Sequence, residues 1–171
     1  MKLKILAAAG FIATILAANY VTTQYGMVPV GFGLVATAGT YFAGAAFVLR
    51  DLVQDKAGPK AVIAVIVAGA ILSYAISSPF IATASAAAFL LSETADFAVY
   101  TPLRKHKHGY FKAAVASNTV GAVVDTILFL TIARFPLSQA FLGQIVGKLA
   151  ITLAVVAAVA LVRFTRRPVT A

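Results

Sequence analysis

Three acidic residues of this sequence lie inside apolar stretches, where an ionisable side chain is costly. The chain has five acidic residues, and Glu93, Asp96 and Asp125 are the three with long apolar runs around them. A charge in hydrocarbon costs at least about 2.5–3.5 kcal/mol on insertion scales, so such groups are expected to face a bundle interior. There they can bind a polar ligand or take up a proton, which makes them the first site candidates.

The spacing of the polar residues places them on common helix faces. Glu93 and Asp96 are three residues apart and Tyr100 follows four later, so all three share one face of a helix. Asn118 and Asp125 are seven apart and share a face of the next helix. A short basic loop joins the two helices and sets the two faces at similar depth. The pattern predicts one shared cavity.

A third polar pair, Gln144 and Lys148, is spaced i,i+4 on the last predicted helix. Lys148 is the one cation within these apolar runs, and Asp125 or Glu93 is its natural partner. A purely structural ion pair remains the alternative. The predicted substrate-binding set is Glu93, Asp96, Tyr100, Asn118, Asp125, Gln144 and Lys148.

Arg50 and Asp51 form a fourth polar group, at the predicted end of the second helix. Their position favours an interfacial cluster with a gating or structural role. Adjacent residues on a helix point about 100° apart, so one simple salt bridge between them is not expected. One member could instead turn inward.

Little in the sequence indicates an enzymatic activity or a metal-binding site. It has no Ser-His-Asp order, no phosphate-cradling glycine loop and no zinc-ligand helix motif, so we expect neither an enzyme nor a cofactor. His106 and His108 resemble metal ligands only loosely and are interpreted as part of a solvated loop. The lack of cysteine excludes disulfides and thiolate metal sites.

The composition places the chain in a membrane. Apolar residues make up 61% and charged residues 11%, against roughly 45–50% and about 25% in soluble domains. The net charge of +9 could suggest nucleic acid, but the basic residues stand in short clusters between apolar runs. That arrangement is typical of membrane topology signals. We therefore expect a lipid bilayer and no nucleic acid as partner.

Six apolar runs predict the elements that position these residues. A membrane-spanning helix needs about 20 apolar residues, with a range of roughly 17–25. Gly58-Pro59, Pro79 and Phe135-Pro136 are among the helix-ending breaks. The prediction is a single all-α domain over residues 1–171, a bundle of six transmembrane helices at residues 5–21, 30–49, 61–76, 80–100, 113–133 and 140–162.

The distribution of basic residues predicts the orientation. Twelve of the 14 Lys and Arg residues fall on one side of this six-span arrangement. Basic residues favour short cytoplasmic loops, so both termini are expected in the cytoplasm of a multi-pass protein of the cell (inner or plasma) membrane. Lys2 and Lys4 before the first apolar run also resemble a signal peptide, with Ala17-Ala18-Asn19 as a cleavage region.

Taken in order, the polar motifs resemble the vitamin uptake transporter (VUT) family, also called the queuosine precursor transporter family. The resemblance runs from about Thr37 to Leu149. It rests on Arg50-Asp51-Leu52-Val53-Gln54-Asp55, Ser92-Glu93-Thr94-Ala95-Asp96, Val99-Tyr100-Thr101-Pro102-Leu103-Arg104, Ser117-Asn118 through Gly121 to Asp125, Gly143-Gln144 and Gly147-Lys148.

The resemblance implies a fold similar to the substrate-binding components of energy-coupling-factor transporters. It also implies uptake of cyano- or aminomethyl-deazaguanine, with the polar residues above at the family's recurring positions. A carboxylate can accept the adjacent ring N–H and amino group of such a base together. Glu93 or Asp96 could do this, and Asn118 or Gln144 could meet the carbonyl side. Tyr100, Phe89, Phe97 or Phe129 could stack on the ring.

Several alternatives stay open at this point. The chain could be a vitamin-binding subunit driven by a separate ATPase, because it has no nucleotide-binding motif of its own. It could be a structural membrane protein whose polar residues only join helices. A homo-oligomer is compatible with every one of these interpretations.

Overall fold

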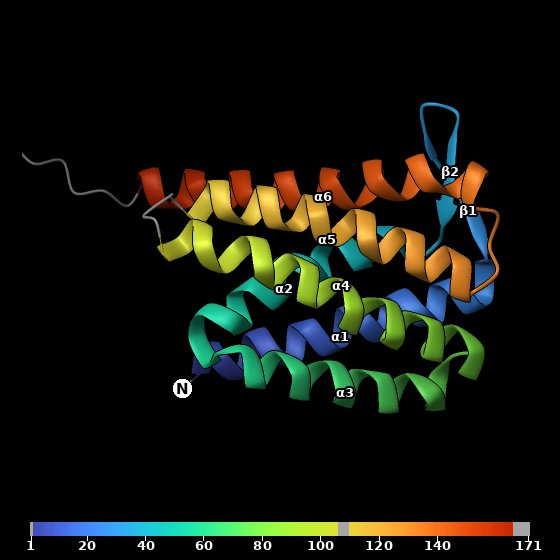
Figure 1. The fold of residues 1–171 in the computed structure, drawn as a ribbon, viewed down its shortest axis with the longest axis horizontal. Helices are drawn as coiled ribbons and strands as arrows, with labels where there is room; N and C mark the ends of the chain where they lie inside the picture. The colour runs from blue at the N-terminus through green and yellow to red at the C-terminus, as the bar shows by residue number, and fades with distance from the viewer. Residues whose placement is uncertain (1, 106–109, 166–171) are drawn as a thin grey trace, which may run out of the picture.

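Six helices and one short β-hairpin make up the structure, a computed structural model that describes residues 2–105 and 110–165 (Figure 1). The predicted all-α class and the six helices are confirmed. The elements are α1 (Lys2–Tyr25), β1 (Met27–Gly31), β2 (Leu34–Thr37), α2 (Thr40–Ala57), α3 (Pro59–Ile76), α4 (Pro79–Lys105), α5 (Tyr110–Ile132) and α6 (Leu137–Thr165).

Four of the described helices are long and apolar enough to cross a membrane: α1, α3, α5 and α6. The helices α2 and α4 do not meet that criterion, because they carry Arg50, Glu93, Asp96 and other charged residues. In the bundle α2 contacts α1, α3, α5 and α6, and α4 contacts α1, α3 and α5. The buried charged side chains of α2 and α4, namely Arg50, Asp51, Glu93 and Asp96, are thus enclosed by the apolar helices, as an all-α membrane protein requires.

The helix connections alternate between the two ends of the bundle (Figure 1). The start of α1, the α2–α3 connection and the last turn of α6 lie at one end, which we call the basic end because Lys4, Lys56 and Lys60 lie there. The hairpin and the α3–α4 and α5–α6 connections lie at the opposite end. All basic residues of the α2–α3 connection are therefore on the side where the chain begins.

The predicted second helix, residues 30–49, is wrong over its first half. Residues 27–37 form an antiparallel hairpin in which Met27 pairs with Thr37 and Val28 with Ala36. Gly31 and Gly33 have φ of +94° and +72°, which a helix cannot accommodate but a tight turn needs. The segment is apolar enough to look like part of a span, so composition concealed the turn. The helix begins only at Thr40 and continues to Ala57.

The other helices extend beyond their predicted bounds. For example, α1 reaches Tyr25 and α4 reaches Lys105, with Pro102 inside its last turns. Apolar composition marks only the part of a helix that suits hydrocarbon. The backbone hydrogen bonds continue into the polar residues at each end.

The hairpin is held close to α6. A Cβ added at Gly143 would lie 2.0 Å from the Val35 carbonyl oxygen, so a glycine is required where the strand crosses the helix. Similarly, a Cβ at Gly44 of α2 would lie 2.8 Å from the Lys148 carbonyl oxygen. Small residues let helices approach each other in this way. These close approaches bring Thr37, Gln144 and Lys148 to one region.

Candidate functional site

A buried ion pair joins α5 and α6. The Lys148 ammonium donates to Asp125 Oδ2 at 2.7 Å and to Thr126 Oγ1 at 2.8 Å. Lys148 is 1% exposed and Asp125 is 6% exposed. A buried charge is tolerated only when it is paired and hydrogen-bonded, and both conditions hold here. Of the two partners predicted for Lys148, the structure selects Asp125.

The hairpin adds a polar wall beside this pair. Gln144 lies one helical turn before Lys148, and its Nε2 donates to the Thr37 hydroxyl at 2.9 Å. Its other amide atom, Oε1, is buried and accepts no hydrogen bond from any described residue. A buried unsatisfied acceptor costs free energy, which a ligand with an N–H group would recover. Gln144 is therefore poised to receive a donor.

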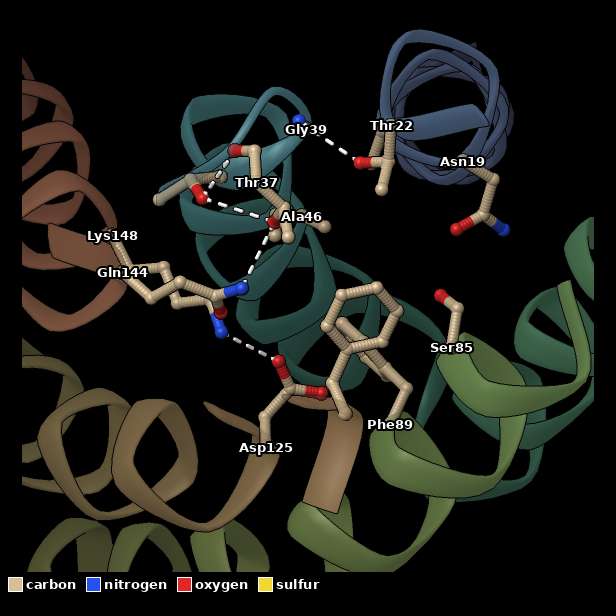
Figure 2. Close-up of a pocket in the computed structure, with 14 residues that line it drawn as sticks. Asn19, Thr22, Thr37, Gly39, Ala46, Ser85, Phe89, Asp125, Gln144 and Lys148 are labelled. Atoms are coloured by element: carbon tan, nitrogen blue, oxygen red, sulfur yellow. Dashed lines mark hydrogen bonds and ion pairs between the residues drawn. The ribbon is translucent and has the colours of Figure 1, made fainter. Parts of the chain in front are cut away.

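These groups line a cavity between α1, α2, α4, α5, α6 and the hairpin, which we call the Lys148 pocket (Figure 2). Its walls combine hydroxyls and amides with two phenyl rings. The lining residues are Ala18, Asn19, Thr22, Thr37, Gly39, Thr40, Ala43, Ala46, Ser85, Phe89, Asp125, Phe129, Gln144 and Lys148.

The Lys148 pocket is narrow in this conformation. Its cavity volume is only about 40 Å³, far below the ~300–1,000 Å³ of small-molecule pockets. A flat base therefore enters only when wall side chains or helices move apart, and the structure shows the site nearly closed.

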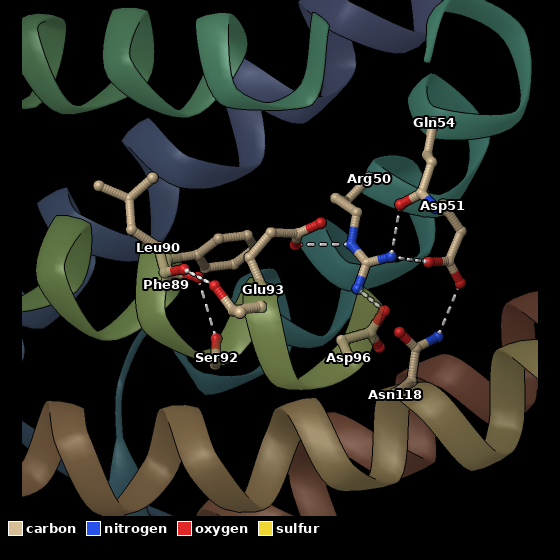
Figure 3. A network of polar contacts seen from close by, with 10 residues as sticks. Arg50, Asp51, Gln54, Phe89, Leu90, Ser92, Glu93, Asp96 and Asn118 are labelled. Carbon is tan, nitrogen blue, oxygen red and sulfur yellow. Dashed lines mark hydrogen bonds and ion pairs between the residues drawn. The ribbon is translucent and has the colours of Figure 1, made fainter. Parts of the chain in front are cut away.

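A second polar group surrounds Arg50, and we call Arg50, Asp51, Glu93, Asp96 and Asn118 the Arg50 cluster (Figure 3). The Arg50 guanidinium pairs with Asp51 Oδ1 at 2.7 Å, with Glu93 Oε2 at 2.8 Å, and with Asp96. Asn118 Nδ2 donates to Asp51 Oδ2 at 3.1 Å. Arg50, Asp51, Asp96 and Asn118 are 0% exposed. The fork-shaped guanidinium can hold several carboxylates at once, which an ammonium cannot do as well.

A stacked phenyl pair lies between the two polar groups. Phe47 precedes Arg50 by three residues on α2, and Phe89 precedes Glu93 by four on α4. Their ring centroids are 5.2 Å apart with an interplanar angle of 18°. Phe89 also lines the Lys148 pocket, whereas neither Glu93 nor Asp96 does. The bundle therefore holds two separate polar sites where the sequence predicted one.

Tyr100 belongs to neither polar group. Its hydroxyl donates to Asp55 Oδ1 at 2.8 Å, and Arg104 lies 3.7 Å from Asp55 Oδ2. This link joins the last turns of α2 and α4 near the basic end. The structure thus divides the predicted substrate-binding set: Asp125, Gln144 and Lys148 share the Lys148 pocket, Glu93, Asp96 and Asn118 share the Arg50 cluster, and Tyr100 lies apart.

The predicted helix end at Arg50 and Asp51 was wrong, because α2 continues for seven residues beyond Arg50 and both side chains are buried. The two residues pair directly, but not as one simple salt bridge, because Arg50 also pairs with Glu93 and Asp96. The long Arg50 side chain makes this contact while its remaining nitrogens reach α4. The length of the side chain lets one buried cation reach three inward-facing carboxylates, and buried charges need such pairing.

Several lining residues were not predicted from the sequence. Thr37 and Ser85 look like ordinary small polar residues, and no spacing rule connects them with Lys148. Asn19 of α1 links two helices, because its Nδ2 donates to Ser73 Oγ of α3 at 2.9 Å. It also lines the Lys148 pocket. His106 and His108 lie outside the described residues.

A model of a known protein family matches this chain. The family is described as "Putative vitamin uptake transporter", and the match covers residues 73–162, more than half of the 171 residues. It includes the acids of α4 and α5 and the Gln144–Lys148 turn of α6. No curated protein and no solved structure matches. The chain therefore belongs to the family described as putative vitamin uptake transporters, and it is an all-α membrane protein of the transporter class.

Proposed function

We propose that the whole chain forms one transport unit that imports a small purine-like base, a cyano- or aminomethyl-deazaguanine precursor of queuosine, through the Lys148 pocket. The observation that carries the proposal is the pocket itself. A buried carboxylate, a buried ammonium and an unsatisfied amide oxygen converge there beside Phe89 and Phe129. Few convergent polar groups in an otherwise apolar pocket are typical of small-molecule sites.

The polar groups match the hydrogen-bonding edge of a deazaguanine. Asp125 Oδ2 accepts from Lys148, and its second carboxylate oxygen turns toward the Phe89 side of the pocket (Figure 2). A carboxylate so placed can accept the base's ring N–H and amino group in a charge-assisted arrangement. Lys148 can donate to the base carbonyl, and Gln144 Oε1 can accept a further N–H. Asp125 takes the role that the sequence suggested for Glu93 or Asp96.

The narrowness of the pocket fits an alternating-access mechanism. Transporters commonly rock helices around a site near the middle of the membrane. The wall formed by the hairpin and α6 rests on the contact between Val35 and Gly143, and the opposite wall is α1 and α4. Separation of these walls would admit the base from the hairpin end. Closure around it would place the ring against Phe89 or Phe129.

The proposal is tested by uptake of labelled cyano-deazaguanine into cells that cannot make it. We expect Asp125→Asn to reduce uptake at least about tenfold, because the amide replaces an acceptor oxygen with a donor facing the base's own donors. Asp55→Asn is the matched control, since it makes the same change outside both polar sites. Equal uptake by wild type and Asp125→Asn, at equal amounts of folded protein, would refute the assignment of the pocket.

We also propose that the basic end faces the cytoplasm of the cell membrane, so that the hairpin faces outward. The chain has no cysteine, so one introduced thiol is unique. Phe32 at the hairpin tip is 96% exposed, and Lys60 lies at the basic end. We expect a membrane-impermeant maleimide to label Phe32→Cys in intact cells and Lys60→Cys only after permeabilisation. Labelling of Lys60→Cys in intact cells would reverse the orientation.

A further inference from the structure

The Arg50 cluster contains more acid than base. Three carboxylates, from Asp51, Glu93 and Asp96, surround the single guanidinium of Arg50. The Lys148 pocket, by contrast, holds one acid and one base. Two uncompensated negative charges inside a bundle of apolar helices are unfavourable, because no second cation among the described residues offsets them. A further positive charge in the Arg50 cluster would offset part of this excess negative charge.

The geometry at Asn118 shows where that charge fits. Its Nδ2 donates to Asp51, which turns its Oδ1 toward the Asp96 carboxylate (Figure 3). Asn118 Oδ1 is fully buried and accepts no hydrogen bond from any described residue. Neither this amide oxygen nor an ionised Asp96 carboxylate carries a hydrogen to donate to the other. A proton on Asp96 would supply that hydrogen.

From these two observations we infer that the Arg50 cluster is a proton-binding site, in which Asp96 carries a proton that it donates to the amide oxygen of Asn118. A proton suits the site better than a metal cation. Arg50 already occupies the centre of the cluster, and a sodium ion there would need several more oxygens and would face a fixed positive charge.

Only a few groups near Asp96 could compete with it for this proton. The groups that face Asp96 among the described residues are Arg50 and Asp51 from α2, Glu93 from α4, and the uncharged Ser117 and Asn118 from α5. Asp125, the one acidic residue of α5, pairs with Lys148 instead. The Arg50 cluster and the Lys148 pocket therefore have no ion-pair partner in common among the described residues.

Glu93 connects the cluster with the outside of the bundle. It is 8% exposed, while its acidic partners are 0% exposed. It also lines a groove between α3 and α4 together with Pro59, Ile63 and Phe97. Pro59 begins α3 at the basic end, so a proton could reach Glu93 along this groove without crossing the Lys148 pocket. Resting on the proposed function, this arrangement would let one proton accompany each imported base.

The proton site can be tested on the purified protein with no substrate present. We expect infrared spectra at neutral pH to show a carboxylic acid C=O band that shifts in D₂O. The band should be absent in Asp96→Asn and present in Asp55→Asn. Asn118→Leu removes the acceptor oxygen together with the amide donor to Asp51, and it should move the band to higher frequency. The assignment is overturned if the wild type lacks the band or if Asp96→Asn keeps it. If Asp96→Asn does not fold, the spectrum of Asn118→Leu decides instead. A band at the wild-type frequency in Asn118→Leu would then refute the site.

The coupling role is tested with the full chain in sealed vesicles that hold a pH-sensitive dye. Added deazaguanine should acidify the lumen of wild-type and Asp55→Asn vesicles but not that of Asp96→Asn vesicles, which should still bind the base. Uptake that needs sodium, or uptake without proton entry, refutes the coupling. Failure of wild type to bind or transport the base would instead refute the proposed function, leaving the infrared result to stand alone.

Discussion

Replacing Arg50 with methionine is expected to prevent the protein from accumulating in folded form. The guanidinium is the only cation that contacts Asp51, Glu93 and Asp96 among the described residues. Removing one partner of a buried pair costs about 3–5 kcal/mol, and here the remaining groups are three acids. Total stability of a domain is only about 5–15 kcal/mol. The measurement is the folded, monodisperse yield in detergent together with the thermal unfolding temperature.

Two further variants separate charge from geometry. Arg50→Lys keeps the charge but loses the fork, so we expect partial recovery of folded protein. Arg104→Met is the matched control, because Arg104 is 40% exposed and its 3.7 Å ion pair with Asp55 is worth at most about 1 kcal/mol. Wild-type stability of Arg50→Met would mean that the three acids do not converge on Arg50.

Replacing Lys148 with methionine is expected to have the second largest effect. The change leaves Asp125 buried beside Thr126 with no cation, at a cost of about 3–5 kcal/mol. The double variant Lys148→Met/Asp125→Leu removes both charges, and apolar replacement of a whole buried pair is often neutral or stabilising. We therefore expect the double variant to regain most of the stability, measured by thermal unfolding in detergent.

The same pair of variants distinguishes a binding site from a structural ion pair. If the pair only holds α5 against α6, the double variant should transport as wild type does. Because we assign both charges to the ligand, we expect the stable double variant to take up no deazaguanine. Normal uptake by a stable double variant would show that the ion pair has only a structural role.

The sequence predicted features that depend on one helix or on charge balance. The spacing of Glu93 and Asp96 placed them on one face, and both do contact Arg50. The shortage of intramembrane cations pointed to Lys148 as the partner of an inward-facing acid, and it pairs with Asp125. These predictions hold because helical periodicity and the cost of burying charge do not depend on the details of packing.

The features that the sequence did not predict depend on packing between elements. Asn118 and Asp125 share a face of α5, yet one meets α2 and the other meets α6. Two residues on a common helix face can still point in somewhat different directions. The stacked rings of Phe47 and Phe89 lie between the two polar groups that Asn118 and Asp125 join. The hairpin at residues 27–37 was missed because its apolar composition hid turn conformations at Gly31 and Gly33.

Equilibrium binding of labelled cyano-deazaguanine to the purified protein tests the central claim most directly. The wild type should bind one base per chain, guanine should compete, and adenine should not, since it lacks the ring N–H next to an amino group. Asp125→Asn should weaken binding at least about tenfold, or about 1.4 kcal/mol, while Asp55→Asn binds normally. Equal affinity of wild type and Asp125→Asn, or no binding to a folded wild type, would contradict the account.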